Sequence, residues 1–356
     1  MTYRVIQWAT GGVGRAAIEG VAEHPALELV GAWVHSKDKV GLDAGAIAGR
    51  APLGVRATSD ADTLLRSEAD CVLYAPQIGK TAELIRILES GKNVVTPLGW
   101  FYPFRSSDVS AIEAACRKGG VSLHGTGIHP GGITERFALM ISALSRGITH
   151  VRAEEFSDIR TYDAPAVVGE VMLFGKTPDE ARRSPMLAML GAGFLQSVDM
   201  VADALGFALD REKRATHEMA LATAPIDSPI GAIAPGRVAA QRFTWQGCVR
   251  GTPVITVRVN WLMGERDLDP AWSFGPEGCR FEVEIEGDPP VRTTFHGLHP
   301  ESVSSGLARN RGIVATAMHC VNAIPAVCRA EPGIRTYLDL PLVAGRAAPQ
   351  LAGSRR

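Results

Sequence analysis

The chain has 356 residues, and its 37 Lys and Arg residues nearly balance its 38 Asp and Glu residues, which leaves a formal net charge of -1. This length predicts roughly two domains with a substantial core. The balanced charge, with no run of basic residues, excludes a typical nucleic-acid or membrane-surface protein and favours a small-molecule partner.

The six cysteines are scattered and include no C-x-x-C pair. We therefore expect reduced thiols in a cytoplasmic protein, with no disulfide framework and no metal site. The longest apolar helical segment, 186–209, is interrupted by Gln196, Asp199 and Asp203. It reads as a core or interface helix and not as a membrane span.

The first third of the chain alternates strand and helix patterns. The predicted strands are Val5–Ala9, Leu27–Val34, Cys71–Ala75, Asn93–Thr96 and Val121–Gly125, and the predicted helices are Ala16–His24, Thr81–Ser90 and Ser107–Lys118. This order predicts an α/β fold with a doubly wound parallel sheet of the Rossmann type. Such sheets bind ligands at the carboxyl ends of their strands.

The turn Ala9–Gly14 follows the first strand and precedes a helix. It reads as G-x-G-x-x-G with Ala9 in the first glycine position, a pattern typical of dinucleotide binding, although a purely structural turn is the alternative. Glycine lets backbone N–H groups approach a pyrophosphate at the positive end of the helix. The residues expected to bind the cofactor are those of this turn and of the following strand ends: Thr10, Gly11, Gly12, Val13, Gly14, His35, Ser36, Lys37, Ala75, Pro76, Thr96, Gly127 and Ile128.

The end of the second strand bears on the choice between NAD and NADP. Enzymes that prefer NAD usually place an acid there, to bond the ribose hydroxyls. Here the strand is followed by His35, Ser36 and Lys37, and the first acid is Asp38. A hydroxyl and an ammonium suit a 2′-phosphate, so we expect NADP, with NAD possible and a solvated loop as the alternative.

After about residue 132 the pattern changes. Helices are predicted at Thr134–Ser145, Ala166–Phe174 and Pro185–Ala208, and alternating strands at Val254–Trp261, Arg280–Glu286 and Val291–Phe295. These strands predict an antiparallel sheet with one wet face, suited to a substrate domain or a dimer interface. A last helix near Gly306–Ala323 is expected to pack back on the nucleotide domain. The predicted organisation is thus a Rossmann domain at 1–132, a substrate-binding and dimerisation α+β domain at 133–304, a returning segment at 305–345 and a disordered tail at 346–356.

The loop Leu123–Gly132 leaves the last predicted parallel strand at its carboxyl end, and its glycines could floor a nicotinamide pocket. His129 is the most plausible proton-transfer group there, because an imidazole titrates near neutrality. Alternatively, His129 forms a hydrogen bond with the loop backbone or with the carboxamide of the nicotinamide. His124, which alternates with apolar neighbours, reads as a core histidine.

The loop Thr96–Pro103 is rich in aromatic residues. Tyr102 is the second candidate proton donor, and Trp100 and Phe101 would line an apolar substrate pocket; a hydrophobic plug under the next helix is the alternative. Glu155 and Tyr162 are placed in the same pocket, although the segment Glu154–Asp158 reads more readily as a solvated strand edge.

The turn at Trp8–Gly14, the loop Gly125–Gly131 and the segments Val321–Pro325 and Leu338–Pro341 resemble the dihydrodipicolinate reductase-like superfamily. The resemblance covers nearly the whole chain and is to the branch of 2,4-diaminopentanoate dehydrogenases and native amine dehydrogenases. It implies a Rossmann domain, an α+β substrate domain that also dimerises, and NAD(P)H-dependent reduction of C=N or C=O bonds.

The chain departs from these relatives at their catalytic residues. The His-His-x-x-Lys stretch of true dihydrodipicolinate reductases is missing around Glu154–Tyr162. The glutamate that amine dehydrogenases of this branch place before a Tyr-Pro is also missing, because Leu98–Pro103 contains no carboxylate. His129 stands where the family usually has asparagine.

The sequence therefore predicts an NADP-preferring oxidoreductase, a homodimer, that transfers hydride to or from a carbonyl or imine carbon of a fairly apolar small molecule. One alternative is an amine dehydrogenase whose carboxylate comes from Glu154, Glu155 or Asp158. Another is a catalytically silent NADP-binding sensor.

Overall fold

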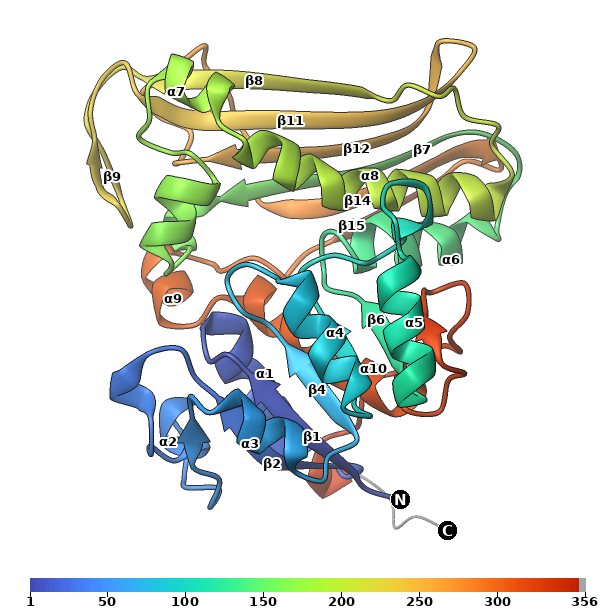
Figure 1. Ribbon diagram of the computed structural model, residues 1–356. Coiled ribbons are helices and arrows are strands. Elements are labelled where there is room, and N and C mark those ends of the chain that lie inside the picture. Colours follow the sequence, from blue (N-terminus) through green and yellow to red (C-terminus); the bar gives the residue numbers. More distant parts are fainter. Residues whose placement is uncertain (352–356) are drawn as a thin grey trace. The chain divides into compact units, whose positions relative to one another are not determined.

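The computed structural model describes residues 1–351, which form two compact units (Figure 1). The first unit contains residues 1–128 together with the C-terminal segment from Ile313, and the second contains His129–Gly312. The breaks fall at 128/129 and 312/313, whereas the predicted boundaries are 132/133 and 304/305. The roles of the two units as cofactor and substrate domains stay predictions.

The first unit is built on a parallel sheet with the strand order β16-β6-β5-β4-β1-β2-β3. Its strands are β1 (Tyr3–Trp8), β2 (Leu27–Trp33), β3 (Ala57–Thr58), β4 (Cys71–Tyr74), β5 (Asn93–Thr96), β6 (Ser122–Gly125) and β16 (Gly333–Ile334). The five strands predicted from apolar runs are all present, and the predicted α/β class is confirmed. The edge strands β3 and β16 are each too short to leave a periodic pattern in the sequence.

Helices and helical turns surround this sheet. They are α1 (Gly12–Glu23), η1 (Lys37–Lys39), α2 (Ala44–Ile47), α3 (Ala61–Arg66), α4 (Thr81–Glu89), η2 (Pro103–Arg105), α5 (Ser110–Gly119), α10 (Arg311–Val327) and η6 (Pro349–Leu351). Helix α5 starts three residues later than predicted, at Ser110, whose N–H donates to the Asp108 carboxylate at 2.9 Å.

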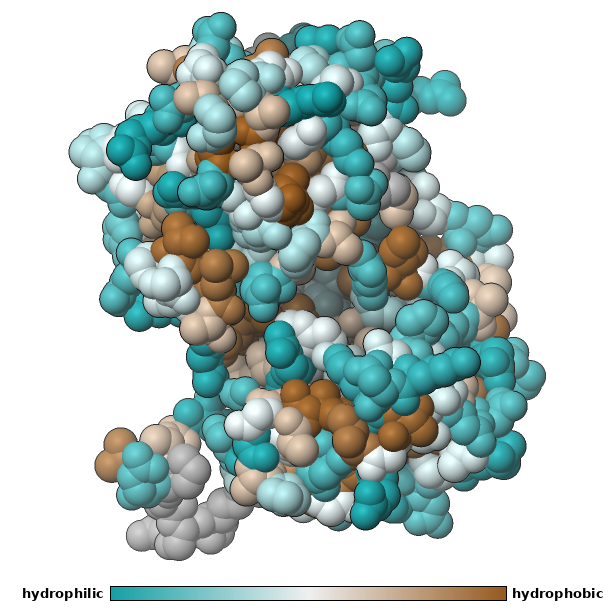
Figure 2. Space-filling model, turned by 90° about the vertical axis from the view of Figure 1, so that its left-hand side faces the viewer, coloured by the Kyte–Doolittle hydropathy of each residue, from teal (hydrophilic) through white to brown (hydrophobic). Residues whose placement is uncertain are grey.

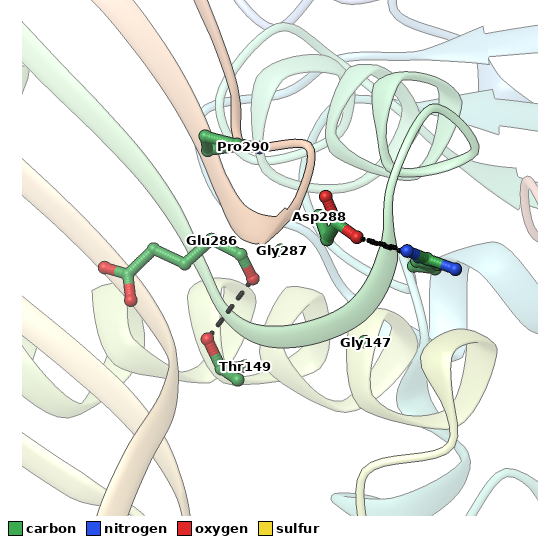
Figure 3. Close-up of a pocket in the computed structure, with 7 residues that line it drawn as sticks. Gly147, Thr149, Glu286, Gly287, Asp288 and Pro290 are labelled. Atoms are coloured by element: carbon green, nitrogen blue, oxygen red, sulfur yellow. Dashed lines mark hydrogen bonds and ion pairs between the residues drawn. The ribbon is translucent and has the colours of Figure 1, made fainter.

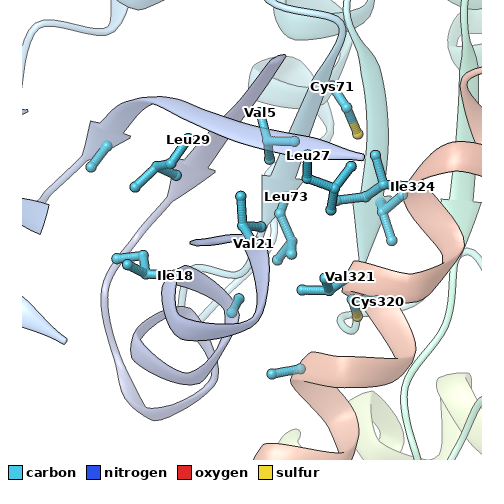
Figure 4. Packing of buried hydrophobic residues seen from close by; sticks show 14 of the residues in the cluster. Val5, Ile18, Val21, Leu27, Leu29, Cys71, Leu73, Cys320, Val321 and Ile324 are labelled. Atoms are coloured by element: carbon cyan, nitrogen blue, oxygen red, sulfur yellow. The ribbon is translucent and has the colours of Figure 1, made fainter. Parts of the chain in front are cut away.

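Helix α10 belongs to the core of the first unit. Val321 and Ile324 of α10 share one buried cluster with Val21 of α1, Val5 of β1 and Leu73 of β4 (Figure 4). The predicted end of this helix before Pro325 is wrong, since α10 continues to Val327. A proline removes one N–H and disfavours a helix interior, but here it lies in the last turn, where little helix follows it.

The second unit is built on a mixed sheet with the order β13-β8-β11-β12-β7-β14-β15. Its strands are β7 (Arg146–Asp158), β8 (Arg214–Ala222), β11 (Val238–Val249), β12 (Thr252–Leu262), β13 (Leu268–Asp269), β14 (Arg280–Asp288) and β15 (Val291–Phe295), and β9 (Ile226–Ser228) and β10 (Gly231–Ile233) form a separate ribbon. The prediction of a purely antiparallel sheet is wrong, because β7 and β12 pair in parallel. Strands β7, β8 and β11 were missed, and β7 is the one that brings a parallel neighbour to β12.

The helices and helical turns of the second unit are η3 (Gly132–Phe137), α6 (Ala138–Ser142), η4 (Ile159–Thr161), η5 (Val167–Val171), α7 (Pro178–Arg183), α8 (Met186–Leu205) and α9 (Val303–Ala308). Helix α8 packs against β11 and β12, and α6 packs against β7 and β14. The ring of Phe194 on α8 stacks on that of Trp245 on β11 at 4.4 Å between centroids. One face of the sheet is therefore covered and rich in aromatic side chains.

Of the charged side chains of β14 that were predicted to form a wet face, Arg280 and Glu282 are buried, Glu284 is half-buried and Glu286 is exposed. Glu282 is 2% and Arg280 8% exposed. The Arg280 Nε donates to Glu282 Oε1 at 2.6 Å, and the guanidinium of Arg152 on β7 bonds Glu282 Oε2 at 3.1 Å. The prediction of a solvated strand edge at Glu154–Asp158 is also wrong, because β7 lies between β12 and β14. The alternation predicted correctly which side chains share a face. Ion pairs to neighbouring strands bury part of the charge on the face that was predicted to be wet.

The surface shows separate apolar groups on a mainly polar background on the face drawn in Figure 2. Each of the six cysteines is free. Within residues 1–351, no helix combines the length and apolarity that crossing a membrane requires. Of the predicted tail, residues 352–356 lie outside the described residues, while Arg346 Nε lies 3.3 Å from His24 Nε2.

Candidate functional site

The turn between β1 and α1 has the features of a phosphate cradle. Gly11 is the N-cap residue of α1, and among the described residues no side chain caps the first N–H groups of this 12-residue helix. Its first turn also contains no acid. A methyl group built on Gly11 would meet nothing within 4 Å, so the space beside its backbone is open. Open N–H groups at a helix N-terminus attract an anion.

Gly14 has a different role in this turn. A Cβ at Gly14 would lie 2.1 Å from the carbonyl oxygen of Ala9, so only glycine allows α1 to pack this closely on the turn. The same oxygen accepts a hydrogen bond of 2.8 Å from Gln7 Nε2. Ala9 itself has a φ of 71°, a value that glycine, the usual residue there, adopts freely. The turn thus keeps the conformation of a dinucleotide-binding turn, and its residues fit a pyrophosphate.

The loop after β2 contributes one residue that the sequence reasoning missed. His35, Ser36 and Lys37 are exposed, as a loop open to a cofactor phosphate would be. Lys39 turns back instead, and its Nζ lies 3.3 Å from the carbonyl oxygen of Thr10. The sequence analysis named Lys37, but the ammonium group that approaches the Ala9–Gly14 turn is that of Lys39, two residues later in η1.

The other predicted cofactor residues lie along one edge of the first sheet. The N–H of Ala75, just beyond β4, donates to the carbonyl oxygen of Trp8 at 3.0 Å. The N–H of Thr126, just beyond β6, donates to the carbonyl oxygen of Thr96 at 2.9 Å. Pro76 follows Ala75, and Gly127 and Ile128 follow Thr126, so these residues belong to the carboxyl edge of the sheet, as predicted.

Two side chains from the C-terminal segment hold this edge. His319 Nδ1 on α10 lies 2.5 Å from the carbonyl oxygen of Gly127, and the hydroxyls of Thr126 and Tyr337 are bonded to each other. His124 is fully buried with Nδ1 at 2.7 Å from the Arg335 carbonyl oxygen, which agrees with its interpretation as a core histidine.

The aromatic loop between β5 and α5 lies in the first unit. Phe101 is 2% exposed, and the ring of Tyr102 meets that of Phe104 edge-on at 5.2 Å. Trp100 has a φ of 56° and its ring approaches Gly79. The packing of Phe101 matches the alternative of a hydrophobic plug, and the assignment of Tyr102 to proton transfer stays a prediction.

Three predicted residues come together in the second unit. His129 Nε2 lies 3.7 Å from Glu155 Oε2, and their side chains are 1% and 12% exposed. Burial raises the pKa of Tyr162, and the charge of Glu155 raises it further, so the phenol lies close enough to interact electrostatically with this acid. In the described part of the chain, no three His, Cys, Asp or Glu side chains are grouped as metal ligands.

Hydrogen bonds hold one oxygen of Glu155. Ser157 Oγ donates to Glu155 Oε1 at 2.6 Å, and Trp261 Nε1 on β12 donates to the same oxygen at 3.0 Å. Ser157 Oγ also lies 2.7 Å from His299 Nε2. Ser157 could have been found from its place two residues after Glu155 on the same strand face. Trp261 and His299 could not, because they reach the site only through the fold.

Burial changes the acid–base properties of this cluster. It raises the pKa of Glu155 from 4.5 to about 7, although the bonds from Ser157 and Trp261 oppose this shift. Burial, with a smaller effect of His299, lowers the pKa of His129 to about 3. This shift opposes the premise that His129 titrates near neutrality, and its role in proton transfer stays a prediction. Glu155 is the group of this cluster that can give or take a proton near pH 7.

Aromatic rings extend from this acid along the covered face of the sheet. The ring of His129 lies 5.0 Å from that of Phe194 and 5.4 Å from that of Phe281, and Phe281 lies 4.6 Å from His299. Ring faces attract cations, and a carboxylate among them favours a protonated amine or iminium.

An open hollow of about 550 Å³ lies at the other end of β7, beside the β14–β15 turn (Figure 3). It is lined by Arg146, Gly147, Thr149, Glu286, Gly287, Asp288 and Pro290. Its arginine is already paired with Asp288 at 2.7 Å, and it includes none of the predicted site residues. The Glu155 cluster is therefore the stronger candidate for chemistry.

The parallel sheet and the open glycine turn at its carboxyl edge give the first unit the architecture of a dinucleotide-binding domain. Residues 133–350 match the 2,4-diaminopentanoate dehydrogenase C-terminal domain, and residues 5–96 match the N-terminus of dihydrodipicolinate reductase. The chain belongs to the 2,4-diaminopentanoate dehydrogenase family and is an NAD(P)-dependent oxidoreductase, as the sequence predicted.

Individual relatives agree with this assignment. The chain is 33% identical over 353 residues to an amine dehydrogenase of Streptomyces virginiae, covering 95% of this chain and 96% of that one. It is 26% identical over 293 residues to the 2,4-diaminopentanoate dehydrogenase of Acetoanaerobium sticklandii, covering 79% and 76%. The structure of an amine dehydrogenase from Mycobacterium smegmatis has the same fold, with a TM-score of 0.77 and 23% identity over 97% of this chain and 98% of that one.

Proposed function

We propose that this protein is an amine dehydrogenase, which interconverts a primary amine with an apolar substituent and the corresponding carbonyl compound with ammonia. In the reductive direction, one carbonyl, one ammonia, one hydride and one proton give one amine and one water. The observation that carries the proposal is Glu155, a buried acid surrounded by aromatic rings. The similarity to the amine dehydrogenase of Streptomyces virginiae supports it.

Glu155 would bind and move the proton in this reaction. Its Oε1 accepts two hydrogen bonds, whereas Oε2 accepts none from the described residues and is the oxygen left for a substrate N–H. A pKa of about 7 lets the carboxyl group serve as acid in one direction and as base in the other. Glu155 on β7 would thus supply the carboxylate that the loop Leu98–Pro103 lacks.

His129 would orient the substrate and not protonate it. With its pKa lowered to about 3, the imidazole is neutral at working pH, with one N–H donor and one acceptor nitrogen. Within the described residues neither ring nitrogen has a hydrogen-bond partner. A substrate oxygen or nitrogen could therefore use the donor, while Phe194 and Phe281 keep the ring in place and exclude water.

The cofactor would be held by the backbone of Gly11–Gly14 through its pyrophosphate, with Lys39 adding a positive charge beside Thr10. When bound, the cofactor supplies or accepts the hydride. We further propose that NADP is preferred, because the exposed Ser36 and Lys37 follow β2 where an acid would favour NAD. Asp38 lies one residue beyond them, in η1.

We also propose a homodimer formed through the second unit, as the family resemblance implies. The face of its sheet opposite α8 carries Arg242, Arg258 and Glu284, whose side chains are still 32–37% exposed. Light scattering on the purified protein would give twice the mass of one chain, and the mass of one chain would contradict the dimer.

The test of function measures NAD(P)H consumption with a panel of apolar ketones and aldehydes, with and without ammonium. We expect turnover that requires ammonium and that falls at least about 100-fold in Glu155→Gln, the size of effect usual for a general acid–base. The matched control is Glu170→Gln, a surface acid of the same unit paired with Lys176. Turnover without ammonium would indicate a carbonyl reductase instead, and no turnover would favour the cofactor-binding sensor.

A further inference from the structure

The hydrogen bonds around Glu155 extend one residue beyond its direct partners. Ser157 Oγ donates to Glu155 Oε1 at 2.6 Å and also lies 2.7 Å from His299 Nε2. A hydroxyl has one proton. When Glu155 is ionised and accepts a hydrogen bond from this hydroxyl, the bond between Ser157 and His299 can form only if His299 Nε2 carries its own hydrogen and donates to Ser157. The direction of the chain is therefore fixed, from His299 through Ser157 to Glu155.

His299 is suited to this single direction. Its Nδ1 is buried and has no hydrogen-bond partner among the described residues, so the proton of a neutral ring is better placed on Nε2, where it is used. Burial, with a smaller effect from the charge of His296, lowers the pKa of His299 to about 4 and keeps the ring neutral. The ring of Phe281, 4.6 Å away, limits how the imidazole can turn.

We propose that Ser157 and His299 are a positioning pair that holds Oε1 of Glu155 and leaves Oε2 facing the substrate. This inference rests on the proposed role of Glu155, but neither residue touches the reacting atoms. Ser157 acts directly on the carboxylate, and His299 acts through Ser157 by preventing its hydroxyl from rotating away. Trp261 holds the same oxygen from the neighbouring strand.

The other groups around Glu155 do not replace this pair. His129 lies on the side of Oε2 at 3.7 Å, and Tyr162 is a phenol whose own pKa burial raises, so it stays neutral. From α8 the ring of Phe194 reaches His129, and from β14 comes the ring of Phe281, both uncharged. Oε1 thus depends on its two donors, and loss of either one destabilises the ionised carboxylate in particular.

The experiment titrates the Glu155 carboxyl group directly in the full-length protein, by infrared difference spectroscopy in which Glu155→Gln identifies its band. Ser157→Ala should raise the titration midpoint by about one unit, the equivalent of one hydrogen bond to a charged group. His299→Leu should raise it by about half as much, because the serine keeps its proton but loses its orientation. His299→Gln, whose amide N–H can replace Nε2, should restore the wild-type midpoint.

Two controls limit the interpretation. Trp261→Phe removes the second donor and should also raise the midpoint, whereas Ser145→Ala, whose hydroxyl donates to the Pro289 carbonyl in the same unit, should leave it unchanged. An unchanged midpoint in both Ser157→Ala and His299→Leu would overturn the positioning role. Failure of His299→Gln to rescue would also overturn the role of its donor.

The same variants separate this inference from the proposed function. The midpoint is measured without substrate, so the expected shifts in a protein that never consumes NAD(P)H would contradict the amine dehydrogenase and leave the positioning pair standing. Ammonium-dependent turnover with unshifted midpoints would do the reverse. If both hold, the acidic limb of the pH profile of kcat/KM moves with the infrared midpoint in each variant.

Discussion

The phosphate turn of the first unit and the acid cluster of the second unit are built in different ways. The turn is made by backbone groups of the continuous segment Ala9–Gly14, and the phosphate binding proposed for it depends on space that side chains leave open. The cluster is made by side chains far apart in the sequence, namely His129, Glu155, Ser157, Trp261 and His299. The backbone turn should therefore be sensitive to substitutions that add side-chain atoms. The side-chain cluster should be sensitive to substitutions that remove a charge or a hydrogen-bond donor.

The largest expected effect is on stability through the charge of Glu155. Since its pKa is raised from 4.5 to about 7, the folded state binds this proton more tightly than the unfolded state does. The associated stability is fully present below the unfolded pKa and is lost as the pH rises through about 7. Glu155→Gln, which stays neutral, should therefore be more stable than wild type above about pH 8 by on the order of 3 kcal/mol.

Urea unfolding at a series of pH values checks this difference. Near pH 4 the two proteins should unfold at similar concentrations, because the wild-type acid is protonated in both states. Glu170→Gln, at a 72% exposed side chain, serves as the control and should follow wild type throughout. A constant difference between Glu155→Gln and wild type across the pH range would show that packing, and not ionisation, separates them.

The next effect separates the two glycines of the turn. Gly14→Ala places a methyl group 2.1 Å from the Ala9 carbonyl oxygen, and relieving this contact should cost about 2 kcal/mol of folding stability. Gly11→Ala meets nothing within 4 Å and should leave stability nearly unchanged, while its methyl group obstructs the phosphate. We therefore expect the midpoint temperature of thermal unfolding to fall only in Gly14→Ala. The affinity for NAD(P)H should fall in both variants. Equal stability of the two variants would contradict the packing role of Gly14.

The same contrast explains what the sequence could predict. The parallel sheet and the turn at Ala9–Gly14 can be predicted from local sequence patterns, namely apolar runs such as Cys71–Ala75 that are followed by glycines or helices. The predicted family, fold class and oxidoreductase activity are all confirmed. The mixed sheet was only partly predicted, because β7 carries acids, arginines and a histidine whose cross-strand partners are invisible in its own pattern.

Glu155 shows why the chemistry was harder to place. From the sequence, Glu154 and Glu155 look like two adjacent surface acids. The strand puts them on opposite faces, where Glu154 joins the ion pairs around Arg152 and Glu155 enters an aromatic surrounding. His129 was chosen because free imidazole titrates near neutrality, but its burial depends on Phe194 and Phe281 from later in the chain.

A smaller effect tests the cofactor preference at the loop after β2. Ser36→Asp adds a negative charge where a 2′-phosphate is proposed to lie, and should weaken NADPH binding about tenfold, or about 1.4 kcal/mol. NADH lacks this phosphate and is the matched control, so its affinity should hold or improve. Fluorescence titration of both cofactors measures this ratio. Equal affinities of wild type and Ser36→Asp for NADPH would contradict the proposed site of the phosphate.

The smallest effect concerns Ala9, which occupies a glycine position with a φ of 71°. An L-residue pays about 1 kcal/mol for this conformation, and glycine does not. Ala9→Gly relieves that strain but adds freedom to the unfolded chain, so the two terms nearly cancel and stability should change by less than about 0.5 kcal/mol. Ala17→Gly in the middle of α1 has no strain to relieve and should cost about 1 kcal/mol or more.

Comparable losses in both variants, measured by urea unfolding, would show that the turn does not hold Ala9 in the left-handed conformation. A near-zero change at Ala9 alone would mean that backbone conformation, and not the identity of the first residue, defines this turn.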